Sequence, residues 1–202
     1  MKIIDITQDV LEAPVYGNDP KPESERILSI ENGDGCNLST LFSCVHNGTH
    51  TDAPLHFIED GKGMLEVPLD AYIGECYVLE VRNGAISGEY VDEFFPDCER
   101  ILLKSGGNAY FLDHGAEAAA ARKYKLVGID SQSVGTHGAQ VRPHRAFLSE
   151  DIAILEGLKL DDVKQGWYYL IALPMKAGNV DGSPIRAVLI EDDIFWAKGV
   201  RE

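Results

Sequence analysis

Three of the six histidines lie within eleven residues, and an aspartate lies among them, in the segment His46-Asn47-Gly48-Thr49-His50-Thr51-Asp52-Ala53-Pro54-Leu55-His56. Imidazole and carboxylate groups are the ligands that zinc, manganese and iron favour in proteins. In an extended segment, His50 and Asp52 point to the same face. Gly48 allows the chain to turn, so His46 can approach the same point. The spacing favours a metal site over a purely structural role.

The elements that must position these residues are mostly strands. Apolar or alternating runs predict strands at 2–6, 26–30, 37–46, 72–81, 100–104, 126–129, 152–155, 167–173 and 185–190. An alanine-rich run predicts a helix at 115–123, and a proline in the first turn favours another at 143–148. The first helix and the strand after it predict one parallel crossover. The pattern indicates a mixed α/β fold with more strand than helix.

The chain has 202 residues and a mass of 22.2 kDa, so we expect a single domain spanning residues 1–202. Apolar residues make up 45% and charged residues 25%, which is typical of soluble globular proteins. The net charge of −15 disfavours nucleic acid and anionic membrane surfaces as partners. No membrane-spanning run or secretory signal is evident, and the cysteines form no C-x-x-C pair. We therefore expect a cytoplasmic protein with buried free thiols.

The histidine-rich segment resembles the H-x-G-T-H-x-D-x-P-x-H signature of the cyclase family, which includes bacterial kynurenine formamidases and isatin hydrolases. Every fixed position matches. The resemblance extends over nearly the whole chain, through Leu126-Val127-Gly128-Ile129-Asp130-Ser131, the pair His144 and Glu156, Leu170-Ile171-Ala172-Leu173-Pro174, and Asp181-Gly182-Ser183-Pro184-Ile185-Arg186. It implies a swivelling β/β/α fold with a central barrel-like sheet. It also implies a homodimer or larger homo-oligomer, with the site near a subunit interface.

The resemblance further implies two divalent metal ions per chain. The residues that match the ligands of the first metal are His46, His50 and Asp52, and those that match the second are Asp52, His144 and Glu156. His56 matches the family's catalytic acid/base. Zinc is the favoured metal, and manganese is also compatible because mixed nitrogen and oxygen ligands accept both.

The implied function is a metal-dependent amidohydrolase that cleaves a small amide. An aryl formamide such as N-formylkynurenine and a cyclic amide such as isatin are the two substrate types that the family suggests. Metal ions activate water and polarise a carbonyl. The leaving amine still needs a proton, and a histidine at the position of His56 is suited to deliver it.

One loop departs from the family pattern. Tyr16 stands where kynurenine formamidases carry a tryptophan that contributes to the substrate pocket, and Gly17 stands where a proline is usual. We therefore expect Tyr16 to line the substrate pocket with an aromatic wall of altered width. His114 and His137 are expected to have surface roles.

Two alternatives remain open from the sequence. His50, Asp52 and His144 have the form of the 2-His-1-carboxylate triad of a non-haem iron oxygenase. That interpretation leaves His46, His56 and Glu156 without a role. The other alternative is a non-catalytic metal-binding relative of such hydrolases, although every matched ligand is present.

Overall fold

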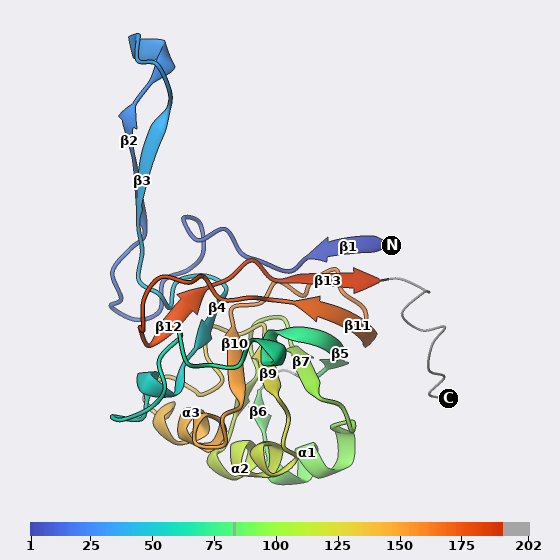
Figure 1. Cartoon of the computed structure of the whole chain (residues 1–202). Coiled ribbons are helices and arrows are strands. Elements are labelled where there is room, and N and C mark those ends of the chain that lie inside the picture. Colours follow the sequence, from blue (N-terminus) through green and yellow to red (C-terminus); the bar gives the residue numbers. More distant parts are fainter. Residues whose placement is uncertain (83, 192–202) are drawn as a thin grey trace.

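One mixed sheet forms the body of the protein (Figure 1). The computed structural model describes residues 1–82 and 84–191. Within those ranges, nine strands form this sheet in the order β1 (Lys2–Asp5), β13 (Val188–Glu191), β11 (Gly166–Ile171), β5 (Ile73–Glu80), β7 (Arg100–Lys104), β9 (Leu126–Ile129), β10 (Ala153–Glu156), β4 (His50–Asp52) and β12 (Gly182–Pro184). Strands β5, β7, β9 and β10 run parallel, and the flanking strands are antiparallel. The sheet curls into a half-barrel.

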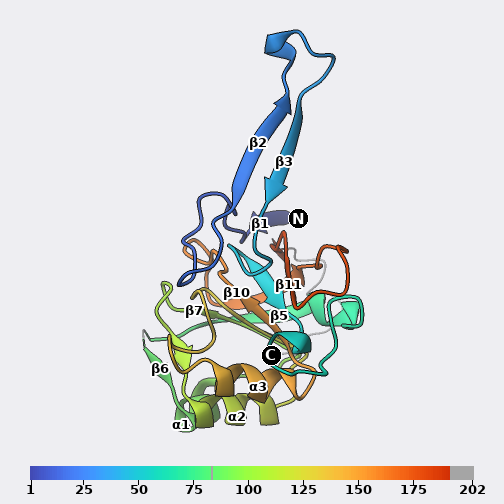
Figure 2. The same ribbon diagram turned by 90° about the vertical axis from the view of Figure 1, so that its left-hand side faces the viewer.

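Helices cover one face of this sheet (Figures 1 and 2). They are α1 (Gly88–Phe94), α2 (Asp113–Ala121) and α3 (Val141–Leu148). The short strands β6 (Ala85–Ile86) and β8 (Tyr110–Phe111) pair beside them, and 3-10 turns span Ile30–Asn32, Pro54–His56 and Leu69–Tyr72. Because α2 lies between the parallel neighbours β7 and β9 along the chain, the predicted parallel crossover is confirmed. The sequence analysis did not predict α1, whose N-cap Ser87 accepts a hydrogen bond from the backbone of Tyr90.

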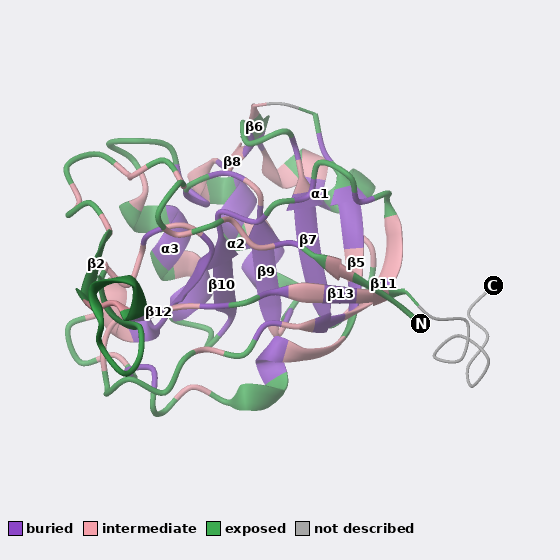
Figure 3. Cartoon of the chain, turned by 90° about the horizontal axis from the view of Figure 1, so that it is seen from above, coloured by how far each residue is buried: buried purple, intermediate pink, exposed green. Residues whose placement is uncertain are grey.

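Alternate residues of the central strands supply two apolar cores. On β7, Ile101 and Leu103 join the core under the helices, and Leu102 joins the core on the opposite face of the sheet. This near-continuous apolar sequence is typical of parallel strands that are buried on both faces. Figure 3 shows these central strands as the most buried part of the molecule. The strand-rich α/β fold expected from the sequence is confirmed.

A hairpin projects from the body and differs from the expectation (Figures 1 and 2). We call residues 23–42 the arm; it contains β2 (Glu23–Leu28) and β3 (Leu38–Phe42). The alternating pattern at 37–46 predicted a longer strand, but β3 ends at Phe42 and all its residues are exposed. The prediction is therefore confirmed over Leu38–Phe42 and wrong for residues 43–46, where the chain leaves the hairpin.

The cysteines also differ in part from the expectation. All four are free, but only Cys76 is buried, whereas Cys36 is exposed near the tip of the arm. Among the described residues, no helix has the length and apolar character needed to cross a membrane.

Candidate metal centre

Strands β4 and β10 bring the central acidic and histidine side chains together. In their antiparallel register, His50 lies opposite Glu156, and Asp52 lies opposite Ile154. Residues in these positions share one face of the sheet. Ile154 on that face packs into the core beneath the helices, and α3 supplies His144 from above it. Four ionisable side chains therefore lie nearly fully buried between the sheet and α3: those of His50, Asp52, His144 and Glu156.

The carboxylate of Asp52 stands between two sets of imidazoles. Its Oδ1 lies 3.0 Å from Nδ1 of His46 and 3.5 Å from Nε2 of His50. Its Oδ2 is buried and accepts no hydrogen bond, and it lies 3.5 Å from Nε2 of His144. A buried carboxylate oxygen without a hydrogen bond is costly in a folded protein unless a cation satisfies it.

Glu156 has a similar bridging arrangement. Its Oε1 accepts a 2.6 Å hydrogen bond from the backbone N–H of Val134 and lies 3.1 Å from Nε2 of His144. Its Oε2 lies 3.5 Å from Nε2 of His50. The backbone contact fixes the carboxylate, so both of its oxygens face ring nitrogens.

The orientation of two imidazoles fits metal binding. Nδ1 of His50 lies 3.0 Å from the carbonyl oxygen of Gly48, and Nδ1 of His144 lies 2.7 Å from that of Gln140. Because a carbonyl can only accept, each Nδ1 carries the hydrogen. In the neutral ring, Nε2 then presents a lone pair toward the carboxylates. Metal-ligating histidines commonly have such a backbone partner on the other nitrogen.

His46 enters the cluster from the chain between the arm and β4. Gly48 adopts a left-handed backbone with φ of 65°, which makes the turn that was expected there. The sequence analysis placed His46 at the end of a strand, but it lies in the connecting turn after β3. Both ring nitrogens face carboxylates, since Nε2 lies 2.9 Å from Oδ2 of Asp181 and Nδ1 faces Asp52.

The sequence analysis assigned no role to Asp181. This residue is 135 positions from His46 along the chain, and the pairing of β12 with β4 brings it to the site. The backbone N–H of Ala53 also donates to its carbonyl oxygen at 2.9 Å. The segment 181–186 entered the sequence analysis only as part of the family resemblance. The acidic residue at its start was the one feature of the sequence that could have pointed to a role in the site.

His56 borders the cluster rather than lying inside it. It belongs to the 3-10 turn after β4, so strand geometry does not set the direction of its side chain. Its ring stacks on that of His46 with centroids 3.9 Å apart, and its Nδ1 lies 3.4 Å from Oδ2 of Asp181. The side chain is 28% exposed, which leaves it accessible from the neighbouring cavity.

The buried charges shift one another's pKa values strongly. Burial alone would lower the pKa of His50, but the carboxylates of Asp52 and Glu156 raise it to about 10. Burial opposes ionisation of Asp52, but the surrounding imidazoles hold the pKa of its carboxyl well below the usual range. The pKa of His56 is lowered, chiefly because burial disfavours the charged ring; Asp52 and Asp181 act in the opposite direction, and the imidazoles of His46 and His144 add to the lowering. His56 is therefore the imidazole in this group that favours the neutral form.

The donor set fits divalent metal ions. Two groups of side chains, among the described residues, offer ligand atoms that lie within 4.8 Å of one another: His46, Asp52 and His56, and His50, Asp52 and Glu156. Both groups contain Asp52, as a shared ligand requires. The first group includes His56, so its ring position allows it to act either as a ligand or as a proton carrier.

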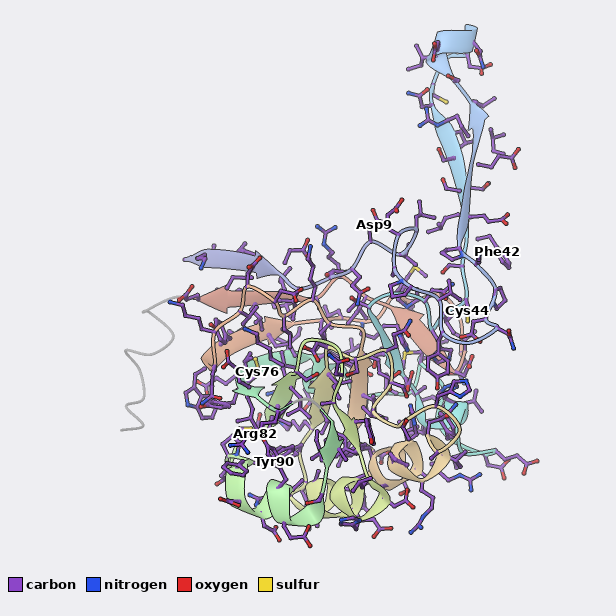
Figure 4. The ribbon with its side chains drawn as sticks, turned by 180° about the vertical axis from the view of Figure 1, so that it is seen from behind. Asp9, Phe42, Cys44, Cys76, Arg82 and Tyr90 are labelled. Atoms are coloured by element: carbon purple, nitrogen blue, oxygen red, sulfur yellow. The ribbon has the colours of Figure 1, made fainter. Side chains whose placement is uncertain are left out.

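A cavity of about 200 Å³ opens over this cluster. Tyr16, the residue predicted to line the substrate pocket, is among the residues that line this cavity. Cys44 also reaches it from the point where the chain returns from the arm to the body (Figure 4). The lining residues that sequence reasoning missed are Asp19, Cys44, Phe57, Gln132, Ser133 and Gln140.

Comparisons with known proteins show which family this chain resembles. Residues 4–136 match the family described as "Putative cyclase". The kynurenine formamidase of Erythrobacter litoralis is 36% identical over 205 residues, which cover 94% of each chain. The solved structure of a predicted metal-dependent hydrolase from Bacillus stearothermophilus has a TM-score of 0.81 and 27% identity, covering 93% of this chain and 97% of that one.

A more distant structure shares the fold. Isatin hydrolase A from Labrenzia aggregata, solved with benzyl benzoate bound, has a TM-score of 0.79, 20% identity and 93% coverage of both chains. The family match covers most of the chain, and the similarity to the formamidase extends over nearly its full length. The chain therefore belongs to the cyclase family.

Proposed function

We propose that this protein is a dinuclear metal-dependent amidohydrolase that cleaves the C–N bond of a small amide. The observation that carries the proposal is the buried Oδ2 of Asp52, which accepts no hydrogen bond and faces His144, while Oδ1 faces His46 and His50. The similarity to a kynurenine formamidase supports the reaction type. The proposed substrate is an aryl formamide such as N-formylkynurenine or a cyclic amide such as isatin.

Two ions would share Asp52 as a bridging ligand. The proposed ligands of the first are His46, His50 and Asp52, and those of the second are Asp52, His144 and Glu156. Five side chains are more than one catalytic zinc ion needs, because such an ion commonly takes three protein ligands and a water. Zinc is the first candidate, and the mixed nitrogen and oxygen donors also suit manganese.

The residues around the cluster would divide the remaining chemistry. When bound, divalent metal ions make water a stronger nucleophile and polarise the amide carbonyl. His56, whose lowered pKa keeps it neutral near pH 7, accepts a proton from the attacking water. The protonated ring then donates that proton to the nitrogen of the leaving amine. Asp181 lies beside Nδ1 of His56 and stabilises the protonated ring.

Tyr16 would form one wall of the substrate pocket. Its ring lies on the cavity lining with His56 and Phe57. An aromatic wall contributes contact area to a bound aromatic substrate, with ring contacts worth about 0.5–1.5 kcal/mol beyond their area. The cavity volume of about 200 Å³ is suited to a small molecule.

We propose that the arm pairs with a second copy of this chain in a homodimer. A two-stranded hairpin alone is marginally stable in water. The arm nevertheless exposes apolar side chains, namely Ile27, Ile30, Leu38, Leu41 and Phe42. Exposed apolar side chains gathered on one element are typical of an interaction surface.

Metal analysis combined with a substrate panel tests the function. The purified protein, loaded with zinc or manganese, should bind two ions per chain and hydrolyse aryl formamides or cyclic amides under strict anoxia. Saturation at one ion per chain would contradict the dinuclear centre. Oxygen consumption coupled to turnover with iron would support an oxygenase instead. A fully loaded protein that cleaves no formamide, lactam or ester would support a non-catalytic relative.

A further inference from the structure

The hydroxyl of Tyr16 is a buried polar group without a hydrogen bond. Among the described residues, its oxygen is one of three buried side-chain polar atoms without a hydrogen-bond partner. Tyr16 is one of the residues that line the cavity, together with His56 and Glu156. A buried hydroxyl nearly always finds a partner, so an exception on a cavity wall points to a partner that enters the cavity.

The loop that carries Tyr16 is held at both ends. The side-chain amide of Gln132 donates to the carbonyl oxygen of Pro14 at 2.7 Å. The side-chain amide of Asn47 donates to the carbonyl oxygen of Pro20 at 2.9 Å. These contacts come from segments distant in sequence, and they set the place of the ring relative to the metal centre.

Local contacts set the direction of the ring. The N–H of Asp19 donates to the carbonyl oxygen of Tyr16 at 3.0 Å, and Gly17 takes a left-handed φ of 52° to close that turn. The ring of His137 lies against Tyr16 with centroids 5.8 Å apart. The fold therefore positions the loop and the ring, whereas the hydroxyl makes no hydrogen bond of its own.

The hydroxyl is suited to donate rather than accept. Burial raises the pKa of Tyr16, and the facing carboxylates of Glu156 and Asp19 raise it further. The phenol thus keeps its proton at all ordinary pH values. A substrate that supplies an oxygen acceptor would satisfy this donor.

We propose that the Tyr16 hydroxyl donates a hydrogen bond to an oxygen of the bound substrate and thereby selects amides that carry a carbonyl or carboxylate close to the scissile bond. This inference rests on the proposed amidohydrolase function. A substrate without such an oxygen leaves the buried donor unpaired, and sites built around a hydrogen bond discriminate strongly against analogues that lack it. Tyr16 is then a specificity-determining residue as well as an aromatic wall.

The test compares two substrates in the metal-loaded protein. One is formanilide, and the other is formanilide with an ortho-acetyl group, which adds a carbonyl beside the formamide. In Tyr16→Phe, kcat/KM for the acetylated substrate should fall about 10- to 100-fold, the effect of losing one hydrogen bond in a buried site. The value for formanilide should fall clearly less than the value for the acetylated substrate, since formanilide lacks the added oxygen and the ring remains. Metal content should stay at the wild-type level.

Tyr90→Phe is the matched control, because Tyr90 lies on α1 and lines none of the described site (Figure 4). Tyr90→Phe should leave kcat/KM unchanged for both formanilide and its ortho-acetyl derivative. An equal fall in kcat/KM for both substrates in Tyr16→Phe would indicate a structural role and would overturn the inference. An unchanged kcat/KM for both substrates would also overturn it. If the wild-type protein hydrolyses neither compound, the proposed function fails and the inference fails with it. If the wild-type protein hydrolyses both compounds and Tyr16→Phe leaves the ratio of their kcat/KM values unaltered, the inference fails but the proposed function stands.

Discussion

Asp52 connects the two halves of the candidate centre because each of its oxygens faces different histidines. Oδ1 faces His46 and His50, and Oδ2 faces His144. Without a metal, the imidazoles balance the carboxylate charge by holding protons. A metal ion would take over that balancing, so protons and metal ions compete for the same site.

Alanine substitutions should separate a ligand from a proton carrier. His50→Ala removes a proposed ligand, and bound metal and activity should fall together, with metal affinity lower by about 10- to 100-fold or more. His56→Ala should keep both ions, while kcat falls by about 10²–10⁴, the usual range for general acid–base catalysis. Metal analysis and steady-state kinetics on the same samples measure both effects.

The outcome for His56 is informative because its ring lies within reach of a metal triad with His46 and Asp52. If His56→Ala loses one ion per chain, His56 is a ligand. The proton must then come from another group. The exposed His114, which does not line the cavity, provides the control: His114→Ala should alter neither metal content nor kcat.

Metal affinity should rise with pH. The carboxylates raise the pKa of His50 to about 10 in the metal-free protein, and they raise the pKa values of His46 and His144 as well. These imidazoles are protonated below their raised pKa values and must lose the proton to bind a metal. Each proton released strengthens apparent binding about tenfold per pH unit. Chelator competition at pH 6 and pH 8 measures the change, and a pH-independent affinity would contradict it.

At the scale of elements, the pairing of β4 with β10 matters most. The register places His50 opposite Glu156, and a slip of one residue would turn His50 and Asp52 to the other face. Thr51 holds this register from the opposite face, since its hydroxyl donates to the carbonyl of Ile154 at 2.7 Å and lies 3.1 Å from the hydroxyl of Tyr72. On β4, His50 and Asp52 thus face the candidate metal centre, and Thr51 on the other face fixes the strand in place.

A charge on the arm should disrupt the proposed dimer. Leu41 and Phe42 are both 62% exposed in the single chain, so replacing either with aspartate removes little buried contact within it. Burying that charge between two copies would be costly. Light scattering should therefore show a dimer for the wild type and a monomer of 22.2 kDa for Leu41→Asp or Phe42→Asp.

Leu65→Asp is the matched control for the arm, because Leu65 is 50% exposed but lies outside the arm. It should remain dimeric. A wild-type protein that is monomeric at every concentration would contradict the pairing of arms. A dimer that survives both arm substitutions would place the interface elsewhere.

At the scale of the whole molecule, metal removal should lower thermal stability. A metal ion would bind a site that exists only in the folded chain, and it would stabilise that state by about 2.7 kcal/mol when free metal is 100 times Kd. For a chain of this size, each kcal/mol corresponds to about 2–4 °C in Tm. Differential scanning fluorimetry with and without a chelator should show a fall of roughly 5–10 °C. The shift should be much smaller in His50→Ala.

Much of the fold follows from local sequence patterns. The predicted strands at 100–104 and 126–129 coincide with β7 and β9, because buried parallel strands appear as short apolar runs. The arm shows where such patterns stop being informative. Alternation at 37–46 indicated a strand correctly over part of its length, but burial depends on what packs against it.

The sequence by itself determined the candidate ligands that lie close together along the chain. His50 and Asp52 are two residues apart on one strand, so strand geometry alone places them on one face. Only the tertiary structure decided the place of Asp181 beside His46, the turn that carries His56, and the unpaired hydroxyl of Tyr16. The physical reason is that local geometry acts over a few residues. Contacts between distant segments arise from the pairing of strands and the packing of loops, which no local pattern contains.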